Sequence, residues 1–386
     1  MSRFLLVVPP LTGHVNPTVG IARELVARGH EVAWTGSEPV LRPLLGPGAR
    51  VLGTGSRLFR PQGGHGLAAL RSLWDGFIVP YARFTAKPVD QVVRDYRPDV
   101  LLVDQHTPAG ALAAHRHGLP WASFAPGAME LGRPFRALPQ VEAWMLGRLR
   151  ELWQRAALPP EEFTDPRFSR ELVLALTGPA LTGAEVFPEQ YALVGPVLAE
   201  RPADPAFPWE RLDPGRRTVL VTMGTLAGGL GADFLSRAVR ALELCGPQVQ
   251  AVVAAPRDLL PALPAGVLAV DRAPVLELMS RGVLDAVLCH GGMNTVGEAL
   301  TYGIPLVVAP IRHDQPFVAA QVVAAGAGVR VPFARVSPAA LAAALRTVLD
   351  GDAHRAAAVR AGASLRAGGG AVAAAGRLEK LVVNRS

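Results

Sequence analysis

The chain has 386 residues, of which 50% are hydrophobic and 18% charged, a balance that excludes a disordered protein and suffices for two domains of ordinary size. The formal charge of +7 comes almost entirely from arginines that are scattered along the chain rather than gathered in one block, so we expect no nucleic-acid partner. Two distant cysteines argue against a disulfide framework, no apolar run reaches transmembrane length, and we therefore expect a soluble cytoplasmic protein without stable membrane insertion.

The first 200 residues alternate short apolar runs with helical patterns. Residues 4–8 are typical of a strand buried on both faces, a Gly-His-Val-Asn-Pro turn follows, and residues 18–28 predict a helix that stops at Gly29. The same alternation predicts further strands at residues 31–36, 100–104 and 120–127 and further helices at residues 67–96, 109–118 and 139–157. Strands separated by helices indicate a doubly wound parallel sheet, which binds its ligands at the carboxyl ends of the strands.

A second alternation follows a segment rich in proline and charge, which we interpret as an interdomain linker at residues 201–217. Strands are predicted at residues 218–224, 248–255, 286–292 and 305–310, and helices at residues 233–244, 275–282, 294–303, 315–326 and 338–350. The sequence thus predicts an N-terminal domain at 1–200, a C-terminal domain at 218–370, and a closing helix and tail at 371–386 that can pack back on the N-terminal domain. Two tandem Rossmann-like α/β domains are expected to face each other across a cleft, which is the natural ligand site.

The stretch HGGMNTVGEALTYGIP, residues 290–305, places a histidine and two glycines between a predicted strand and a predicted helix. Glycines let an anion approach the backbone, and a helix N-terminus offers N–H groups and a partial positive charge. His290, Asn294 and Thr295 add side-chain donors at the same end. Taken singly, Asn-Thr before a helix is usually an N-cap and a strand-end histidine is usually structural, so the interpretation depends on the ordered set.

Three further polar side chains follow in an order that suits the rest of a nucleotide sugar. Glu298 lies one helical turn after Asn294, where a carboxylate can accept hydrogen bonds from a ribose diol. Asp314 and Gln315 follow the next predicted strand and offer groups for sugar hydroxyls. Together these residues predict a nucleotide-sugar site, although Glu298 alone would be an ordinary solvated helix residue.

This stretch, with the AP and DQ pairs that follow it, resembles the signature of the UDP-glycosyltransferase family, the inverting glycosyltransferases of the GT-B fold. More narrowly, it resembles the bacterial macrolide and antibiotic branch, and the N-terminal GHVNP and two-domain layout extend the resemblance over most of the chain. The resemblance implies a UDP- or dTDP-linked sugar as donor, with no further cofactor and no metal. It implies that the diphosphate binds His290, Gly292, Asn294 and Thr295, that the ribose binds Glu298, and that the donor sugar binds Asp314 and Gln315.

One element departs from the family pattern. Many relatives carry W-x-P-Q ahead of the signature, with the tryptophan stacked on the base, whereas the matching stretch here is Arg272-Ala273-Pro274-Val275. A planar guanidinium can lie flat on a base. We therefore keep Arg272 and Val275 as the residues expected beside a uracil or a thymine.

His14 is the predicted catalytic base. It follows the first strand in PLTGHVNP, and transfer of a sugar to a hydroxyl needs a base to take the acceptor proton as the oxygen attacks C1. Asp104 ends another strand of the same half, where its carboxylate can hold one imidazole nitrogen. The family's catalytic His–Asp pair falls on these two positions. His106 is a nearby rival, and a capping or solvated role for His14 is the alternative.

The leaving diphosphate gains charge in the transition state and must be stabilised. We expect the helix N-terminus at Asn294, together with His290, to do this in place of a divalent metal. Thr222 and Thr225, in the strand and loop TVLVTMGT, match a Gly-Ser/Thr loop of the family and are candidates for a further phosphate contact. The D-x-D sequence at 350–352 falls between two helical stretches, so we interpret it as a turn and not as a metal site.

The acceptor is expected to bind the N-terminal domain, where residues 74–84, WDGFIVPYARF, cluster aromatic side chains on a predicted helix. The helical spacing favours core packing for most of them, and the alternative is that part of the cluster lines an apolar acceptor pocket. The candidates for acceptor contacts are Trp74, Phe77, Tyr81, Phe124, Met129 and Trp144. Acceptor pockets differ widely within one fold, so these residues do not identify the acceptor.

The sequence therefore predicts an inverting GT-B glycosyltransferase that moves a hexose from a UDP- or dTDP-sugar to a hydroxyl, or an aromatic carbon, of a hydrophobic small molecule. Two alternatives stay open: a nucleotide-sugar epimerase of the same fold, and a non-catalytic protein that holds a nucleotide sugar or an aglycone. The presence of His14, Asp104, Glu298 and Asp314 argues against the second alternative. A monomer and a homodimer are both compatible with the sequence.

Overall fold

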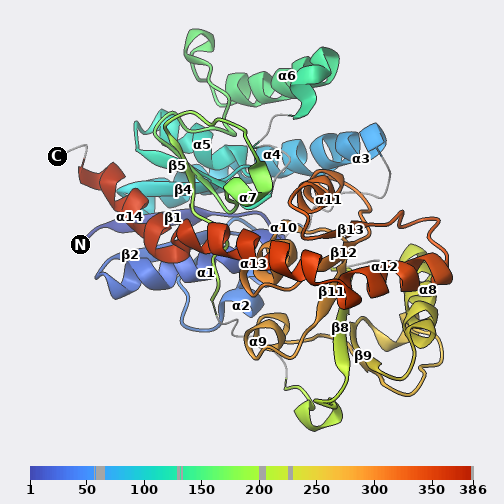
Figure 1. The fold of residues 1–386 in the computed structure, drawn as a ribbon. Coiled ribbons are helices and arrows are strands. Elements are labelled where there is room, and N and C mark those ends of the chain that lie inside the picture. Colours follow the sequence, from blue (N-terminus) through green and yellow to red (C-terminus); the bar gives the residue numbers. More distant parts are fainter. Residues whose placement is uncertain are drawn as a thin grey trace. The chain divides into compact units, whose positions relative to one another are not determined.

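Two compact α/β units make up the chain (Figure 1). The computed structural model describes residues 1–55, 57, 66–127, 131, 134–199, 206–224 and 229–383. Unit 1 consists of Met1–Thr177, Glu185–Ala203 and Gly368–Ser386, and unit 2 of Gly178–Ala184 and Asp204–Ala367. The C-terminal end of the chain therefore belongs to the same unit as the N-terminal end.

A seven-stranded parallel sheet forms the centre of unit 1, in the order β3-β2-β1-β4-β5-β6-β7. Its strands are β1 Arg3–Val7, β2 Glu31–Gly36, β3 Val51–Gly53, β4 Val100–Asp104, β5 Trp121–Ala125, β6 Leu172–Ala175 and β7 Tyr191–Leu193. In the pairing of β1 with β4, Phe4 lies opposite Val100 and Val7 opposite Val103. The strand order reverses between β1 and β4, which makes this point the switch point where α/β sheets place their ligands.

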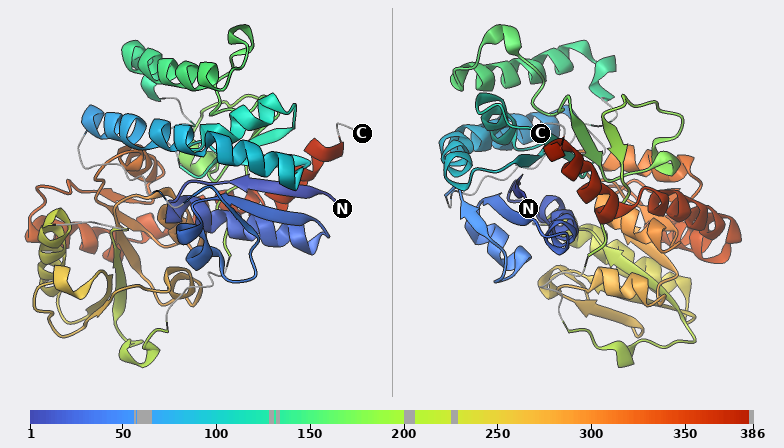
Figure 2. Two further views of the ribbon diagram at one scale, coloured as in Figure 1. Left: turned by 180° about the vertical axis from the view of Figure 1, so that it is seen from behind. Right: turned by 90° about the vertical axis from the view of Figure 1, so that its left-hand side faces the viewer.

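Helices cover both faces of this sheet. They are α1 Thr12–Ala27, α2 Glu38–Leu45, α3 Gly66–Leu73, α4 Val79–Tyr96, α5 Pro108–Arg116, α6 Pro139–Arg155 and α14 Gly370–Val383, with a π-helical turn at Trp74–Ile78. Helices α1 and α14 lie on one face of the sheet, and α4 and α5 on the other (Figures 1 and 2). Phe4 and Leu6 share a core with α1 and α14, whereas Leu5 and Val7 share a core with α4 and α5. Successive side chains of a strand point to opposite faces, so a strand covered on both sides must be apolar throughout.

Unit 2 contains a six-stranded parallel sheet in the order β10-β9-β8-β11-β12-β13. Its strands are β8 Arg217–Thr222, β9 Val249–Ala254, β10 Val267–Val270, β11 Ala286–Cys289, β12 Leu306–Val308 and β13 Gly328–Arg330. The order reverses between β8 and β11, which is the switch point of this unit.

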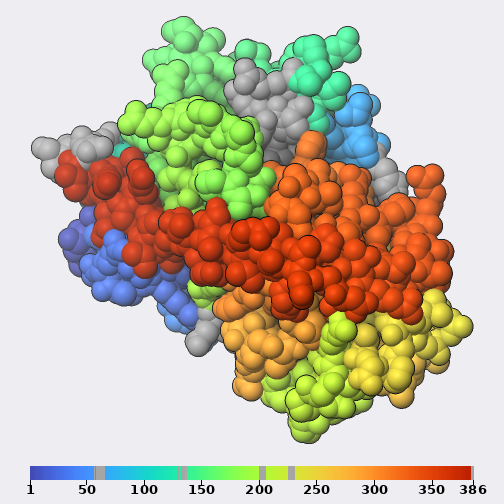
Figure 3. Space-filling model, viewed as in Figure 1, coloured from blue at the N-terminus to red at the C-terminus, as the bar shows by residue number. Residues whose placement is uncertain are grey.

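The helices of unit 2 are α7 Pro179–Thr182, α8 Gly229–Cys245, α9 Val275–Ser280, α10 Met293–Thr301, α11 Gln315–Ala324, α12 Pro338–Asp350 and α13 Asp352–Ala367. Val219 and Val221 of β8 share an apolar core with α8 and α12. Helix α13 packs on α10, where a Cβ atom on Gly362 would lie 2.1 Å from the Leu300 carbonyl oxygen. The space-filling view shows the outer sides of α12 and α13, in orange-red, at the surface of this unit (Figure 3).

Two parallel-sheet Rossmann-like units confirm the predicted fold class, but some elements differ from the prediction. Helix α2 was not predicted. Helix α1 begins at Thr12 rather than at Thr18, so His14 lies in its first turn and Pro17 lies inside the helix. Strands β3, β6, β7, β10 and β13 were not predicted. Each has only three or four residues, which is too short for a periodic signal.

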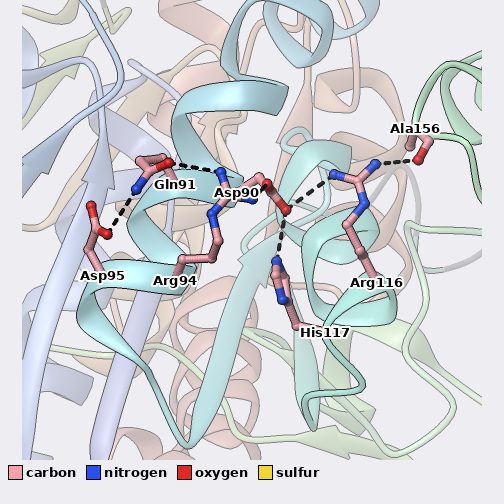
Figure 4. A network of polar contacts seen from close by, with 7 residues as sticks. All are labelled: Asp90, Gln91, Arg94, Asp95, Arg116, His117 and Ala156. Carbon is pink, nitrogen blue, oxygen red and sulfur yellow. Dashed lines mark hydrogen bonds and ion pairs between the residues drawn. The ribbon is translucent and has the colours of Figure 1, made fainter.

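A buried carboxylate joins α4 to the end of α5 (Figure 4). Asp90 is 6% exposed, and its oxygens lie 2.8 Å from His117 Nε2, 3.2 Å from Arg116 and 2.6 Å from Arg94. Burial by itself would raise the pKa of Asp90, but the hydrogen bonds from His117 and Arg116 and the positive charges of Arg116 and Arg94 outweigh it and lower the pKa. Asp90 is therefore an ionised link between the two helices.

We expect Asp90→Asn to lower the free energy of unfolding at pH 7 by about 1–3 kcal/mol, because it removes the charge that these partners share. A carboxylate whose pKa is lowered by folding stabilises the fold above its unfolded pKa of about 4 and loses that contribution as the pH falls further. The difference between the wild type and the variant in urea unfolding should therefore shrink as the pH is lowered from about 5 to about 3.

The matched control is Asp95→Asn, an exposed acid on the same helix that accepts a hydrogen bond from Gln91. It should change stability by less than about 0.5 kcal/mol. Equal losses for Asp90→Asn and Asp95→Asn would contradict a special role for the buried carboxylate.

Candidate functional site

The carboxyl ends of β1 and β4 bring a histidine and an aspartate together at the switch point of unit 1. Asp104 is the last residue of β4 and is fully buried, and His14 lies in the first turn of α1, which follows β1. His14 Nδ1 lies 2.8 Å from Asp104 Oδ2. The His14 side chain is 20% exposed, so solvent reaches the imidazole but not the carboxylate. The structure thus joins two side chains that are 90 residues apart in the sequence.

Two neighbouring groups fix the Asp104 carboxylate and its strand end. Its second oxygen, Oδ1, accepts a hydrogen bond from the backbone N–H of His106 at 2.8 Å. Thr107 Oγ1 lies 2.8 Å from the carbonyl oxygen of Asp104 and 3.1 Å from that of Val7, which links β4 to β1. The His106 ring lies beside that of His14, with 4.6 Å between centroids and 34° between planes. The site therefore holds a second imidazole next to the predicted base.

Arg167 is a buried cation near this site that the sequence did not single out. It is 3% exposed, and its guanidinium lies 2.7 Å from Asp165, 3.5 Å from Glu142 and 5.5 Å from the centre of the Trp74 ring. Gln105, the residue after β4, donates a hydrogen bond to the Arg167 carbonyl oxygen at 3.1 Å. A lone arginine in a loop has no periodicity to mark it, and the Asp-Pro-Arg turn was the one signal that could have pointed to it.

The aromatic acceptor candidates of unit 1 lie in its core. Four of them are at most 2% exposed: Trp74, Phe77, Tyr81 and Phe124. Trp144 is partly buried and packs edge-on against Trp74 at 6.3 Å, and Met129 lies outside the described residues. Core packing, which the helical spacing favoured for residues 74–84, describes Trp74, Phe77 and Tyr81, and Phe124 of β5 is buried as well. A contact of any of these rings with an acceptor stays a prediction.

His290 follows β11 at the switch point of unit 2, and its ring stands between two glycines. A Cβ atom on Gly224 would lie 2.9 Å from ring carbon Cε1, and one on Gly292 would lie 2.8 Å from Nε2. Burial lowers the pKa of His290 to about 4, while a hydrogen bond with the Thr222 backbone opposes the shift and the charge of Arg312 adds to it. His290 is therefore neutral at pH 7 and can offer an N–H donor to a ligand, but not a positive charge.

The N-cap residue of helix α10 is a glycine. Gly292 is its N-cap, so the N–H groups of the first turn have no cap side chain, and Asn294 and Thr295 lie inside that turn. Gly291 has a φ of 87°, and a Cβ atom there would lie 2.8 Å from Val308, so this position requires glycine. The N-cap interpretation of Asn294 is therefore wrong, and this helix end has the N–H groups and the partial positive charge that suit an anion.

The remaining polar residues of the motif lie inside α10 and at the start of α11. Glu298 is 5% exposed, which excludes a solvated surface role. Asp314 is the N-cap of α11, and Gln315 is its first residue. Gln315 Oε1 accepts hydrogen bonds from the backbone N–H groups of Ile311 at 2.8 Å and Arg312 at 2.9 Å. The Gln315 side chain therefore holds the loop before α11, and its NH₂ group remains the part that can reach a sugar.

The other predicted donor residues are spread over unit 2. Arg272 is exposed in the loop between β10 and α9, and Val275 is the first residue of α9. Thr225 lies outside the described residues. Helix α12 ends at Asp350 and α13 begins at Asp352, so the predicted turn at the D-x-D sequence is confirmed.

The geometry can be compared with known proteins. Residues 243–380 match the family described as Erythromycin biosynthesis protein CIII-like, C-terminal domain. The chain is 30% identical to 4'-demethylrebeccamycin synthase of Lentzea aerocolonigenes, over 90% of this chain and 92% of that protein. The glycotransferase of kitacinnamycin has a TM-score of 0.81 and 26% identity, over 98% of this chain and 99% of the other. Spinosyn rhamnosyltransferase SpnG, complexed with thymidine diphosphate, has a TM-score of 0.74 and 27% identity, over 95% and 96% of the two chains.

The two parallel-sheet units and these likenesses define a glycosyltransferase of the GT-B fold. The chain belongs to the family of antibiotic-type glycosyltransferases, with an EryCIII-like C-terminal domain. The predicted family and the predicted enzyme class are confirmed. Among the described helices, none combines the length and the apolar character needed to cross a membrane.

The neutral state of His290 can be measured. We expect the His290 ring signals in an NMR titration to stay unchanged from about pH 8 to about pH 5 and to shift only as the pH approaches 4, because burial disfavours the imidazolium. The His290→Gln variant assigns the signal by its loss. His115, which pairs with Glu162 near the surface, serves as the reference histidine. A midpoint for His290 near the ordinary value of about 6.5 would contradict this description of the site.

Proposed function

We propose that the protein is an inverting, metal-independent glycosyltransferase that moves a hexose from a UDP- or dTDP-sugar to a hydroxyl of a hydrophobic small molecule. The observation that carries this proposal is the 2.8 Å contact between His14 Nδ1 and the fully buried Asp104 carboxylate at the switch point of unit 1. Because Nδ1 is directed at Asp104, the proposal assigns to Nε2 the removal of the proton from an acceptor.

In the proposed step, His14 Nε2 takes the hydroxyl proton while the acceptor oxygen forms a bond to C1 of the sugar. The bond from C1 to the diphosphate oxygen breaks on the opposite face, so the configuration at C1 inverts and the nucleoside diphosphate leaves. Asp104 holds the productive tautomer of His14 and stabilises the imidazolium that forms. His14 is thus the general base, and Asp104 is the residue that positions it.

Unit 2 is proposed to hold the donor. The N-terminus of α10, with Gly292, Asn294 and Thr295, would bind the diphosphate, and neutral His290 would donate a hydrogen bond to it. These donors would stabilise the leaving group without a cation. Glu298 is assigned to the ribose.

The remaining donor contacts complete the proposal for unit 2. Asp314 and the NH₂ group of Gln315 are assigned to the donor sugar, with Thr225 as a further phosphate contact. Arg272 and Val275 are assigned to the base. A relative of 27% identity is described as complexed with thymidine diphosphate, which supports dTDP as one of the two donor classes.

The relatives also bear on the acceptor. The names of the similar proteins refer to rebeccamycin, kitacinnamycin and spinosyn, and this supports a hydrophobic natural product as acceptor here. All three are glycosyltransferases or synthases of natural products, so nothing favours the epimerase or the non-catalytic binding protein. Transfer to a hydroxyl is the reaction for which the His14–Asp104 pair supplies the needed base.

Donor binding by unit 2 can be tested without an acceptor. We expect dTDP or UDP to raise the melting temperature, since a ligand at a hundredfold excess over its dissociation constant stabilises a protein by about 2.7 kcal/mol. EDTA should not change the shift. Glu298→Gln should reduce the shift, measured relative to the melting temperature of the same variant without ligand. The control variant Glu277→Gln removes an exposed ion pair with Arg281 and should leave the shift unchanged. No shift with either nucleotide would remove the donor site.

The general base can be tested by turnover. We expect His14→Ala to lower kcat by about 10²–10⁴, the usual worth of a positioned base. Asp104→Asn should lower kcat as well, because an amide cannot stabilise the imidazolium. The matched control is His115→Ala in the same unit, which should turn over like the wild type. The assay is nucleoside diphosphate release from dTDP- or UDP-glucose with a panel of apolar phenols, and near-normal turnover by His14→Ala would end the assignment.

A further inference from the structure

We propose that His14, Asp104 and His106 form a binding site for a zinc-type divalent ion, and that an ion bound there blocks the transferase reaction. One ligand atom from each of the three side chains lies within 4.8 Å of the others. Among the residues that the structure describes, these three side chains are the group with the number and spacing of ligand atoms that could hold a metal ion.

The chemistry of the three side chains fits zinc. Two imidazoles and one carboxylate are a ligand set typical of zinc ions that keep one position open for water or another ligand. Zinc lies about 2.0–2.2 Å from such ligand atoms, so two ligands of one tetrahedral ion lie roughly 3.3–3.5 Å apart. The separations here, 2.8 Å for His14 Nδ1 to Asp104 Oδ2 and at most 4.8 Å for the others, reach that spacing when the two rings move by on the order of 1 Å.

The backbone already holds the cluster in place. Asp104 ends a strand in the interior of the sheet, and the N–H of His106 donates a hydrogen bond to its Oδ1. Carboxylates that bind metal ions are commonly held by such hydrogen bonds from neighbouring groups. The Thr107 hydroxyl links the carbonyl oxygens of Asp104 and Val7. The His14 and His106 rings, 4.6 Å apart, lie side by side on these supports. Only the side-chain torsions of the two histidines have to change when an ion enters.

An ion at this site competes with catalysis, and this part of the inference rests on the proposed function. A neutral imidazole has one nitrogen lone pair, and a metal ion takes it whether the ion binds Nδ1 or Nε2. His14 then has no lone pair for the acceptor proton. Coordination also replaces the hydrogen bond between the Asp104 carboxylate and His14 Nδ1. Zinc should therefore inhibit an enzyme that EDTA leaves active.

Binding is tested directly, on the full chain and without substrates. We expect cobalt(II), which replaces zinc and absorbs visible light, to bind with one ion per chain and to give the bands of a four- or five-coordinate site. Zinc chloride should displace it, and calorimetry should give the same stoichiometry. In the wild type, cobalt should broaden the NMR signals of the His14 and His106 rings before those of the other histidines.

Two variants separate this site from adventitious binding. His106→Gln keeps a polar side chain of similar reach and should weaken zinc binding by about tenfold or more, since even the loss of a supporting residue costs about 10–100-fold in metal affinity. His115→Gln removes a histidine that also pairs with a carboxylate, Glu162, and should leave the affinity unchanged. Thermal unfolding of both variants checks that each is folded. The NMR experiment uses the wild type and therefore does not depend on the folding of either variant.

The outcomes distinguish this proposal from the proposed function. Absence of cobalt or zinc binding, or equal weakening by His106→Gln and His115→Gln, overturns the metal site whatever the turnover shows. Zinc binding at the cluster without loss of turnover, measured relative to the metal-free rate of each variant, supports the site and removes His14 as the base. If zinc binds the cluster and inhibits turnover, and His106→Gln relieves the inhibition, the result supports both the metal site and the role of His14 as the base.

Discussion

The pairing of β1 with β4 is the constraint on which the chemistry of unit 1 depends. Parallel strands that meet where the strand order reverses place their carboxyl ends at one edge, and this brings Asp104 to His14. A buried carboxylate is costly unless hydrogen bonds satisfy it. His14 Nδ1 and the N–H of His106 do so from two sides. The imidazole is therefore held in place because the buried carboxylate would be destabilised without its hydrogen bond to His14.

Unit 2 uses the same topology for a different electrostatic purpose. At the reversal between β8 and β11 the sheet presents a helix end and a neutral histidine instead of a carboxylate and a base. Glycine at the N-cap of α10 keeps side chains away from the first N–H groups, and Gly224 makes room for the His290 ring. A helix end that attracts anions through backbone dipoles can bind a diphosphate without a cation, and this is the reason for proposing a metal-free donor site.

In the proposed function, each switch point has one part of a sugar transfer. Unit 1 would supply a base held by a buried acid, and unit 2 would supply hydrogen-bond donors for the charge that develops on a leaving diphosphate. The same nitrogen chemistry that suits His14 to the role of base also suits it to bind a metal ion, and His106 would complete a ligand set that the proposed transfer reaction does not use. Control by a metal ion would therefore follow from the way the base is built.

The sequence by itself determined the alternation of strands and helices, which depends on periodicity, and the ordered motif from His290 to Gln315, which depends on neighbours along the chain. The resemblance of that motif to a known family implied the GT-B class. It could not show strands β3, β6, β7, β10 and β13, which are short and form only by pairing with other strands, or the start of α1 at Thr12, where Pro17 suggested a later beginning. The sequence also predicted that Asp104 pairs with His14, and the tertiary structure shows that contact. Only the tertiary structure decided that the His106 ring lies beside that of His14, that Gly292 is the N-cap and that Arg167 is buried against the Trp74 ring. Those contacts join residues far apart in the chain, or depend on how deeply a side chain is buried, and burial and long-range pairing are properties of the packed fold.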